Sequence, residues 1–139
     1  MKKLKVCFVS KYPPIEGGEA AKAYWLIRGL GKRGHRICVA TNAFEVEDKY
    51  REKLEGDDLQ FYQPRNVSVF NTDPFINPHF IPFCPAYSAK LVSLATEVVE
   101  RYDVDLIDSW YLIPYGFVGL VVKSLTRKPL VVRRAGSDI

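Results

Sequence analysis

Short apolar runs alternate with longer segments of helical repeat over most of this chain. The first run is continuously apolar, as in a parallel strand buried on both faces. Five runs are expected to be strands, at residues 4–10, 37–41, 67–70, 105–109 and 130–133. Apolar residues spaced three and four apart predict helices from residue 18 to about residue 32, at 87–102 and at 114–125. This alternation predicts an α/β domain, Rossmann-like and three-layered (α/β/α), with a parallel sheet of strand order 3-2-1-4-5.

Two segments interrupt the alternation. Residues 42–66 are polar and charged, and residues 48–55 are expected to form a short surface helix. Residues 71–86 hold four prolines interleaved with apolar residues, which excludes a regular helix or a central strand there. The apolar loop 75–83 either packs against its own domain or docks on a partner or a membrane surface, since exposed apolar patches mark interfaces.

Composition places the chain among soluble globular proteins. Its 139 residues are enough for one domain with a core, 47% of them are apolar and 26% are charged. No apolar run approaches the ~20 residues of a membrane span. The basic N-terminus is followed by too short an apolar run for a signal peptide. We therefore expect a cytoplasmic protein, either free or at the periphery of a membrane.

The net charge of +4 is dispersed, without a compact block of lysine and arginine. This argues against nucleic-acid binding and leaves room for a basic face attracted to anionic lipids or sugars. Cys7, Cys38 and Cys84 form no CxxC pair and predict neither a disulfide framework nor a zinc site. Cys7 and Cys38 fall in expected strands and are interpreted as small core residues in a reducing compartment.

The first expected strand is followed by a turn with Gly17 and Gly18, and then by a helix. Adjacent glycines have no Cβ, so a phosphate can come close to the backbone. The first N–H groups of a helix lack partners and lie at the positive end of its dipole. The turn predicts a phosphate site, as for a nucleotide, although a plain strand-to-helix connection has the same pattern. It matches neither the GxGxxG fingerprint nor a P-loop.

Other aromatic and cationic groups follow the fourth and fifth strands, at the carboxyl edge of the sheet where ligands bind in such folds. Trp110, Tyr111 and Tyr115 either cap the core or form a wall on which a sugar ring stacks. Of Arg133 and Arg134, one is expected to pair with a carboxylate or face solvent, and the other to face the cleft as a fixed cation.

Four further polar residues have competing interpretations. Asp108 either orients groups in the cleft or is solvated, and Asp138 either caps a following helix or binds a ligand. His35 lies at the opposite end of the sheet and is expected to be structural, and His79 lies in the proline-rich loop. Histidines in these positions predict no Ser-His-Asp arrangement.

Several of these segments together resemble the N-terminal half of GT-B glycosyltransferases. The similarity covers nearly the whole chain and is strongest to family 4, retaining enzymes that include glycogen-synthase-like and phosphatidylinositol-mannosyltransferase-like proteins. The matching segments are KVCFVSKYPP at 5–14, the glycine pair at 17–18, RGH at 33–35, VAT at 39–41, DLI at 105–107 and RAGSD at 134–138.

The resemblance implies two Rossmann-like domains facing a cleft, with residues 1–139 in the first, acceptor-side domain. Gly17 and Gly18 would approach the diphosphate of a nucleotide-sugar donor held by a second domain. The acceptor, a carbohydrate or a lipid-linked sugar, would be bound by Trp110, Tyr111, Tyr115, Arg134 and Asp138. No metal ion or other cofactor is implied, because cationic groups assist departure of the nucleoside diphosphate.

The sequence departs from the family pattern in three respects. Ser109 and Trp110 stand where many members have a histidine after the fourth strand, and Arg134 stands where many have one before the Gly-Ser-Asp turn. The donor-binding domain, with its paired glutamates, is expected on a longer chain or a partner, so no catalytic residue is assigned. Three functions therefore stay open: half of a retaining glycosyltransferase, inactive alone; a non-catalytic module binding a nucleotide or phosphosugar; and an interaction protein docking through loop 75–83.

Overall fold

The computed structural model describes residues 1–53, 58–74 and 85–134. Within them lies a five-stranded sheet of order β3-β2-β1-β4-β5, and every neighbouring pair is parallel. The strands are β1 (Lys5–Val9), β2 (Arg36–Thr41), β3 (Val67–Asn71), β4 (Leu106–Trp110) and β5 (Leu130–Arg133). The predicted fold class and strand order are confirmed.

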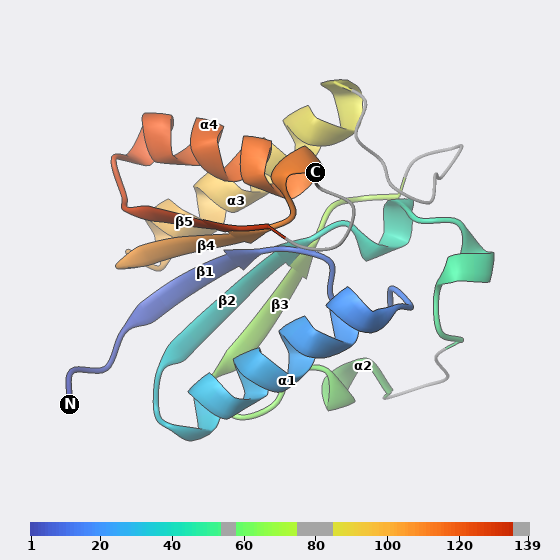
Figure 1. Ribbon diagram of the computed structural model, residues 1–139, viewed down its shortest axis with the longest axis horizontal. Coiled ribbons are helices and arrows are strands. Elements are labelled where there is room, and N and C mark those ends of the chain that lie inside the picture. The colour runs from blue at the N-terminus through green and yellow to red at the C-terminus, as the bar shows by residue number, and fades with distance from the viewer. Residues whose placement is uncertain (54–57, 75–84, 135–139) are drawn as a thin grey trace.

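Helices cover both faces of this sheet (Figure 1). The longer helices are α1 (Gly18–Lys32), α3 (Pro85–Arg101) and α4 (Phe117–Thr126), and α2 (Asp58–Phe61) is a single turn. The α3 and α4 helices lie on one face, and α1 lies on the other. The result is the three-layer arrangement expected when parallel strands are joined by helical crossovers.

The alternation of side chains along β1 builds a core on each face. Cys7 and Val9 pack on the side of α3 and α4, whereas Val6 and Phe8 pack on the side of α1. Cys7 lies beside Cys38 in the register of β1 and β2, and both thiols are free. Burial raises the pKa of the Cys7 thiol, which fits the predicted role as a small core residue.

The expected helix over residues 48–55 was wrong. The structure has a single 3₁₀ turn, η2 (Asp48–Tyr50), and Arg51 has extended backbone angles. Residues 54 and 55 of the expected helix lie outside the described residues. Arg51 forms an isolated antiparallel bridge with Ile15, and the Glu52 N–H donates to the Pro14 carbonyl at 2.8 Å. Because the Glu52 N–H bonds to the segment after β1, it is not available for a hydrogen bond within a helix.

The helix expected at residues 114–125 begins later than the apolar repeat indicated. A wide turn, η3 (Leu112–Gly116), precedes α4, and Ile113 within it has extended backbone angles (φ −127°, ψ 127°). Ile113 precedes Pro114, and a residue before proline is disfavoured in the helical region. The regular helix therefore starts at Phe117.

His35 is structural, as expected, because its Nδ1 accepts the Leu4 N–H at 3.1 Å. No helix in the described part of the chain is long and apolar enough to cross a membrane. The loop 75–83, with His79, and Cys84 lie outside the described residues.

Candidate functional site

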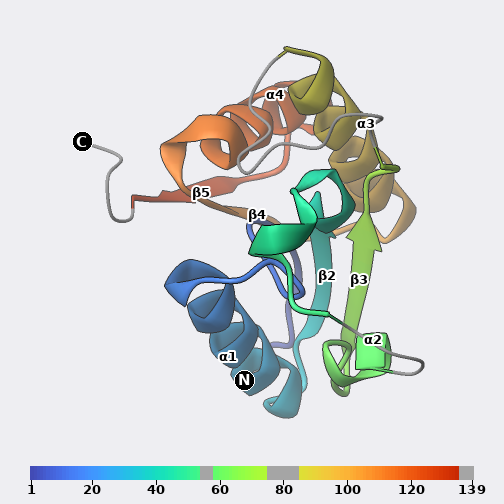
Figure 2. The ribbon, with the colours of Figure 1, turned by 90° about the vertical axis from the view of Figure 1, so that its right-hand side faces the viewer.

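All strands point the same way, so their carboxyl ends lie along one edge of the sheet (Figure 1). In Figure 2 the segment that contains η1 (Ala43–Glu45) and η2 lies in front of the strand ends. Polar groups at this edge form two clusters, one after β1 and β4 and the other after β2 and β3.

The glycine turn after β1 opens into a cavity of about 200 Å³. Gly17 is the N-cap of α1 and has φ 120° and ψ 164°, a conformation that side chains other than hydrogen rarely allow. A Cβ built on Gly17 or on Gly18 would meet no atom within 4 Å. The turn is therefore not walled off, and a ligand can reach its main chain. The lining residues are Lys11, Glu16, Gly17, Gly18, Glu19, Ala20 and Tyr111.

The first turn of α1 supplies donors to this cavity. The Ala21 N–H bonds to the Gly17 carbonyl at 3.1 Å and begins the helical ladder. The N–H groups of residues 18–20 precede that ladder, at the positive end of the helix dipole. Such a terminus is a binding site for anions such as phosphate.

Side-chain charge in the cavity is mixed. The Lys11 ammonium lies 4.9 Å from the centre of the Tyr111 ring, within range of a cation–π interaction. Glu19 is bonded to Lys22 at 3.1 Å, which offsets its charge. Glu16 adds a second carboxylate to the lining. The main-chain donors and Lys11 are the groups that favour an anion here.

Tyr111 is brought beside the glycine turn by the backbone after β4. It has φ 72°, its N–H donates to the Arg133 carbonyl at 3.0 Å, and its carbonyl accepts the Gly116 N–H at 2.7 Å. A Cβ on Gly116 would lie 2.8 Å from that carbonyl, so glycine is required at 116. Among the expected acceptor-site residues that the structure describes, Tyr111 is the one in the cavity lining.

Trp110 faces the core. It is 8% exposed, and its indole N–H donates to the Asp108 carboxylate at 3.1 Å. The Arg133 guanidinium lies 5.3 Å from the ring centre and bonds to both Asp108 oxygens, at 2.7 and 2.8 Å. These bonds raise the pKa of Arg133 and give Asp108 a pairing role rather than a solvated one. Trp110 consequently has no open face on which a sugar can stack.

Tyr115 is a core residue as well. It is 1% exposed, and its hydroxyl donates to the Asn42 side-chain oxygen at 2.8 Å. Burial raises the pKa of the Tyr115 hydroxyl. The expectation of a stacking surface is therefore corrected for Tyr115, since the ring is enclosed on all sides. Arg134 is exposed after β5, and Asp138 lies outside the described residues.

A second polar cluster lies after β2 and β3 and was not predicted. Glu45 is fully buried, its Oε1 accepts the Thr72 hydroxyl, and the Lys90 Nζ lies 3.7 Å from it. Burial raises the pKa of Glu45, while Thr72 and Lys90 act in the opposite direction. The sequence signal was present in polar residues just after two strands, at 41–42 and 71–72.

Metal binding has no support in the described geometry. Within residues 1–53, 58–74 and 85–134, no group of three or more His, Cys, Asp or Glu side chains could hold a metal ion.

Comparison with known proteins points to the same kind of fold. No family model matches the chain. An uncharacterized glycosyltransferase of Methanocaldococcus jannaschii is 28% identical over 131 residues, which are 92% of this chain and 30% of that protein. The chain thus spans about a third of the length of this curated relative.

Solved structures extend the comparison. The calicheamicin glycosyltransferase CalG4 superposes with a TM-score of 0.61 at 17% identity, over 98% of this chain and 31% of that one. The fold is glycosyltransferase-like. The C-terminal domain of the PF1911 hydrogenase from Pyrococcus furiosus has a TM-score of 0.60 at 16% identity, over 96% of this chain and 94% of that one. At such identities these structures define the fold alone.

Proposed function

We propose that this chain is the acceptor-side part of a retaining glycosyltransferase that uses a nucleotide-sugar donor. The observation that carries the proposal is the open cavity at Gly17 and Gly18, bordered by Lys11 and Tyr111. It lies beyond the ends of β1 and β4, where strand order changes direction and ligands bind in open α/β sheets. The general similarity to glycosyltransferases supports this assignment.

In this proposal a second domain binds the nucleotide and brings the diphosphate to the glycine turn. The N–H groups of residues 18–20 and the Lys11 ammonium stabilise the negative charge that develops as the nucleoside diphosphate departs. Closure of the two domains would exclude water and complete the site. No metal is needed in this scheme, because the charge is met by main-chain donors and a cation.

The acceptor is proposed to lie on the Tyr111 side of the cavity. The Lys11 cation lies over the Tyr111 ring, and Tyr111 also lines the cavity. In the proposal, the sugar lies against the part of the Tyr111 ring that borders the cavity. Arg134 and Asp138 follow β5 in the sequence and stay part of the proposed acceptor site. The acceptor class, a carbohydrate or a lipid-linked sugar, is part of the proposal.

Calorimetric titration of the 139-residue chain tests the diphosphate site. We expect inorganic pyrophosphate, UDP and GDP to bind, and uridine and guanosine to bind at least tenfold more weakly, because the site recognises phosphate. Equal affinity for nucleosides and their diphosphates, or no binding of any of them, would contradict the proposal.

A non-catalytic module that binds a nucleotide or phosphosugar is the second candidate. It is favoured by the open glycine turn, because a phosphate can be bound there without any catalytic group. Sugar transfer distinguishes the two. If the chain is part of a transferase, joining it to a donor-binding domain should give release of nucleoside diphosphate. If it is a binding module, no release is expected.

A further inference from the structure

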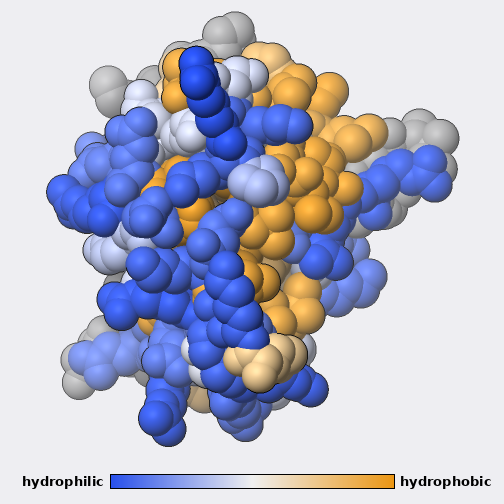
Figure 3. Space-filling view, turned by 90° about the vertical axis from the view of Figure 1, so that its left-hand side faces the viewer, coloured by the Kyte–Doolittle hydropathy of each residue, from blue (hydrophilic) through white to orange (hydrophobic). Residues whose placement is uncertain are grey.

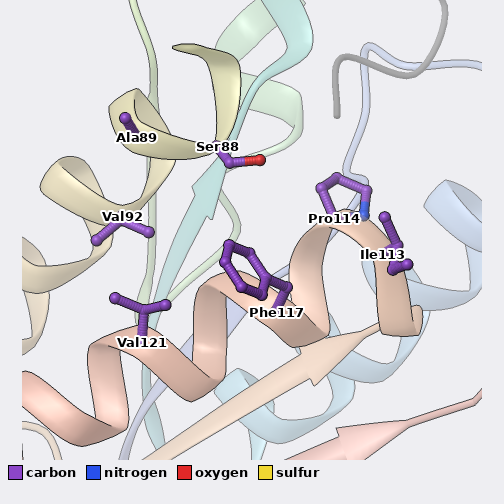
Figure 4. A pocket seen from close by; sticks show the side chains of 7 residues that line it. All are labelled: Ser88, Ala89, Val92, Ile113, Pro114, Phe117 and Val121. Carbon is purple, nitrogen blue, oxygen red and sulfur yellow. The ribbon is translucent and has the colours of Figure 1, made fainter. Parts of the chain in front are cut away.

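Apart from Met1, the large apolar side chains exposed on the described part of the chain lie in two separate places. One place lies over α4 and β5, is mostly aliphatic, and forms the orange area in Figure 3. It adjoins an apolar cavity of about 550 Å³ between α3 and α4, into which the Phe117 ring points (Figure 4). The other place lies across the sheet, on α1 and α2, and consists of two aromatic rings. These are Trp25, which is 61% exposed, and Phe61, which is 67% exposed.

The two exposed rings belong to one aromatic cluster, because α2 lies beside α1 (Figures 1 and 2). Between ring centres, Tyr24 is 5.1 Å from Trp25 in an edge-on contact and 5.9 Å from Phe61, on which it stacks. The Tyr62 ring meets Phe61 edge-on at 5.4 Å. We call Tyr24, Trp25, Phe61 and Tyr62 the aromatic platform. Because both exposed rings contact Tyr24, one extended ligand can reach both of them.

The aromatic platform is fixed by the core beneath it. Tyr24 is buried among the side chains that lie between α1 and the sheet. The hydroxyl of Tyr12, a residue of the same core, donates to the Tyr62 carbonyl at 2.5 Å. Rings held in this way lose little conformational freedom when a ligand binds, which favours binding. The platform is therefore a rigid surface with two rings open to solvent.

Charged groups of both signs flank the aromatic platform. The Arg28 guanidinium lies 5.3 Å from the centre of the Trp25 ring, within range of a cation–π interaction. On the α2 side, the Glu52 carboxylate accepts the Tyr62 hydroxyl. A guanidinium and a carboxylate together supply hydrogen-bond donors and acceptors without adding net charge. A flat aromatic surface with such a rim fits a sugar ring, which has C–H groups on its faces and hydroxyls at its edge.

We propose that the aromatic platform binds a neutral oligosaccharide. Sugars of one chain would stack on Trp25 and Phe61, and their hydroxyls would bond to Arg28 and Glu52. A second copy of this chain fits less well, because a stable interface buries roughly 800 Å² on each partner and two exposed rings supply only part of that area. An anionic polymer also fits less well, because the Glu52 carboxylate would repel it.

The position of the aromatic platform bears on the acceptor. Trp25 follows Gly18 by two turns of α1, which is about 10 Å along the helix axis. Tyr62 also lines a cavity of about 160 Å³ together with Pro13 and Pro14, in the segment that leads to the glycine turn. An acceptor of several sugars would therefore extend from the glycine turn to the platform. This last step rests on the proposed function, whereas oligosaccharide binding itself does not.

Tryptophan fluorescence tests the binding. The chain has two tryptophans, and Trp110 is buried, so acrylamide quenches mainly Trp25. We expect at least one of maltohexaose, cellohexaose and mannohexaose to protect Trp25 from acrylamide in a saturable way. Glucose and mannose should bind about tenfold more weakly than that hexasaccharide, because a single sugar covers one ring only. Protection by none of the three hexasaccharides would overturn the proposal.

Calorimetric titration of variants with the same hexasaccharide separates stacking from general apolar contact. Trp25→Leu keeps an apolar side chain without the flat ring and should weaken binding about tenfold, whereas Trp25→Phe keeps a ring and should stay within about threefold of the wild type. Phe61→Ala should weaken binding about fivefold. Leu125→Ala shortens a side chain that is 60% exposed on α4 and should leave binding unchanged. Circular dichroism checks the fold, and if Trp25→Leu does not fold, Phe61→Ala decides.

Two further results would overturn the proposal. One is wild-type affinity for the hexasaccharide in both Trp25→Leu and Phe61→Ala. The other is a dimer in light scattering that Trp25→Leu converts to a monomer, which would assign the platform to a second copy. Pyrophosphate should bind Trp25→Leu as it binds the wild type, because the platform is separate from the glycine turn. Failure of the wild type to bind pyrophosphate would therefore count against the proposed function and not against oligosaccharide binding.

Discussion

At the ends of β2 and β3 the polar side chains are buried and bond to one another, whereas at the ends of β1 and β4 the chain leaves an open turn without side chains. Glu45, Thr72 and Lys90 form the first arrangement, and Asn42 with Tyr115 extends it. Gly17 and Gly18 form the second, with free space where their Cβ atoms would be. Both regions occupy the same edge of the same sheet.

The difference separates stability from binding. A buried polar group that already has its partner stabilises the fold and offers little to a ligand, and removing one partner leaves the other unsatisfied. An open main-chain terminus contributes little to packing and keeps its donors for an anion. Substitutions after β2 and β3 should therefore change unfolding, and substitutions at the glycine turn should change binding.

Tyr115→Ala should have the largest effect on stability. The ring is enclosed, and removing a buried aromatic side chain costs about 3–5 kcal/mol in the free energy of unfolding. Urea denaturation measures the change. Tyr115→Phe is the matched control: it keeps the ring, leaves the Asn42 oxygen unsatisfied and should cost about 1–3 kcal/mol. A loss below about 3 kcal/mol for Tyr115→Ala would show that the side chains at the ends of β2 and β3 are not tightly packed.

Gly17→Val tests the turn itself. Its φ of 120° and ψ of 164° lie in a region used almost solely by glycine, so the substitution should cost about 1–3 kcal/mol through backbone strain. Gly18→Val is the control, because Gly18 has ordinary φ and open space, and its change should stay within about 0.5 kcal/mol. If both variants melted like the wild type, the turn would have a different conformation in solution.

Glu45→Gln sharpens the comparison through pH. Burial raises the pKa of Glu45, so the folded state holds this proton more tightly than the unfolded chain does. The stability of the wild type relative to the variant should therefore fall as the pH rises from the ordinary carboxyl pKa through the raised one. One proton limits the slope to about 1.4 kcal/mol per pH unit. A rise over that range would mean that the Lys90 pair outweighs burial.

The sheet could be read from the sequence because its strands are short apolar runs in a regular alternation with helices. The same local signal could not place side chains. Trp110 and Tyr111 are adjacent, yet one faces the core and the other lines the cavity, because the backbone turns at Tyr111 with a positive φ. That turn is held partly by the Tyr111 N–H, which donates to the Arg133 carbonyl on the neighbouring strand, and this contact is tertiary. The polar residues after β2 and β3 were a local signal, but the bonds of Glu45 span 27 residues or more in the chain, so its partners could not be predicted.

The glycine turn could be predicted as a candidate site for a physical reason. Its proposed function needs no side chain, so the two glycines and the helix after them contain the whole signal. Their neighbours in the cavity were harder, because Lys11 and Tyr111 meet only when β1 and β4 pair.

A pyrophosphate titration followed by amide chemical shifts of the nitrogen-15-labelled chain tests the central claim most directly. We predict saturable shifts at residues 18–20 in the wild type, and their loss in Gly18→Val while its unfolding free energy is unchanged. The same titration curve in Gly18→Val, or shifts that gather at Thr72 and Lys90 instead of the glycine turn, would contradict the account.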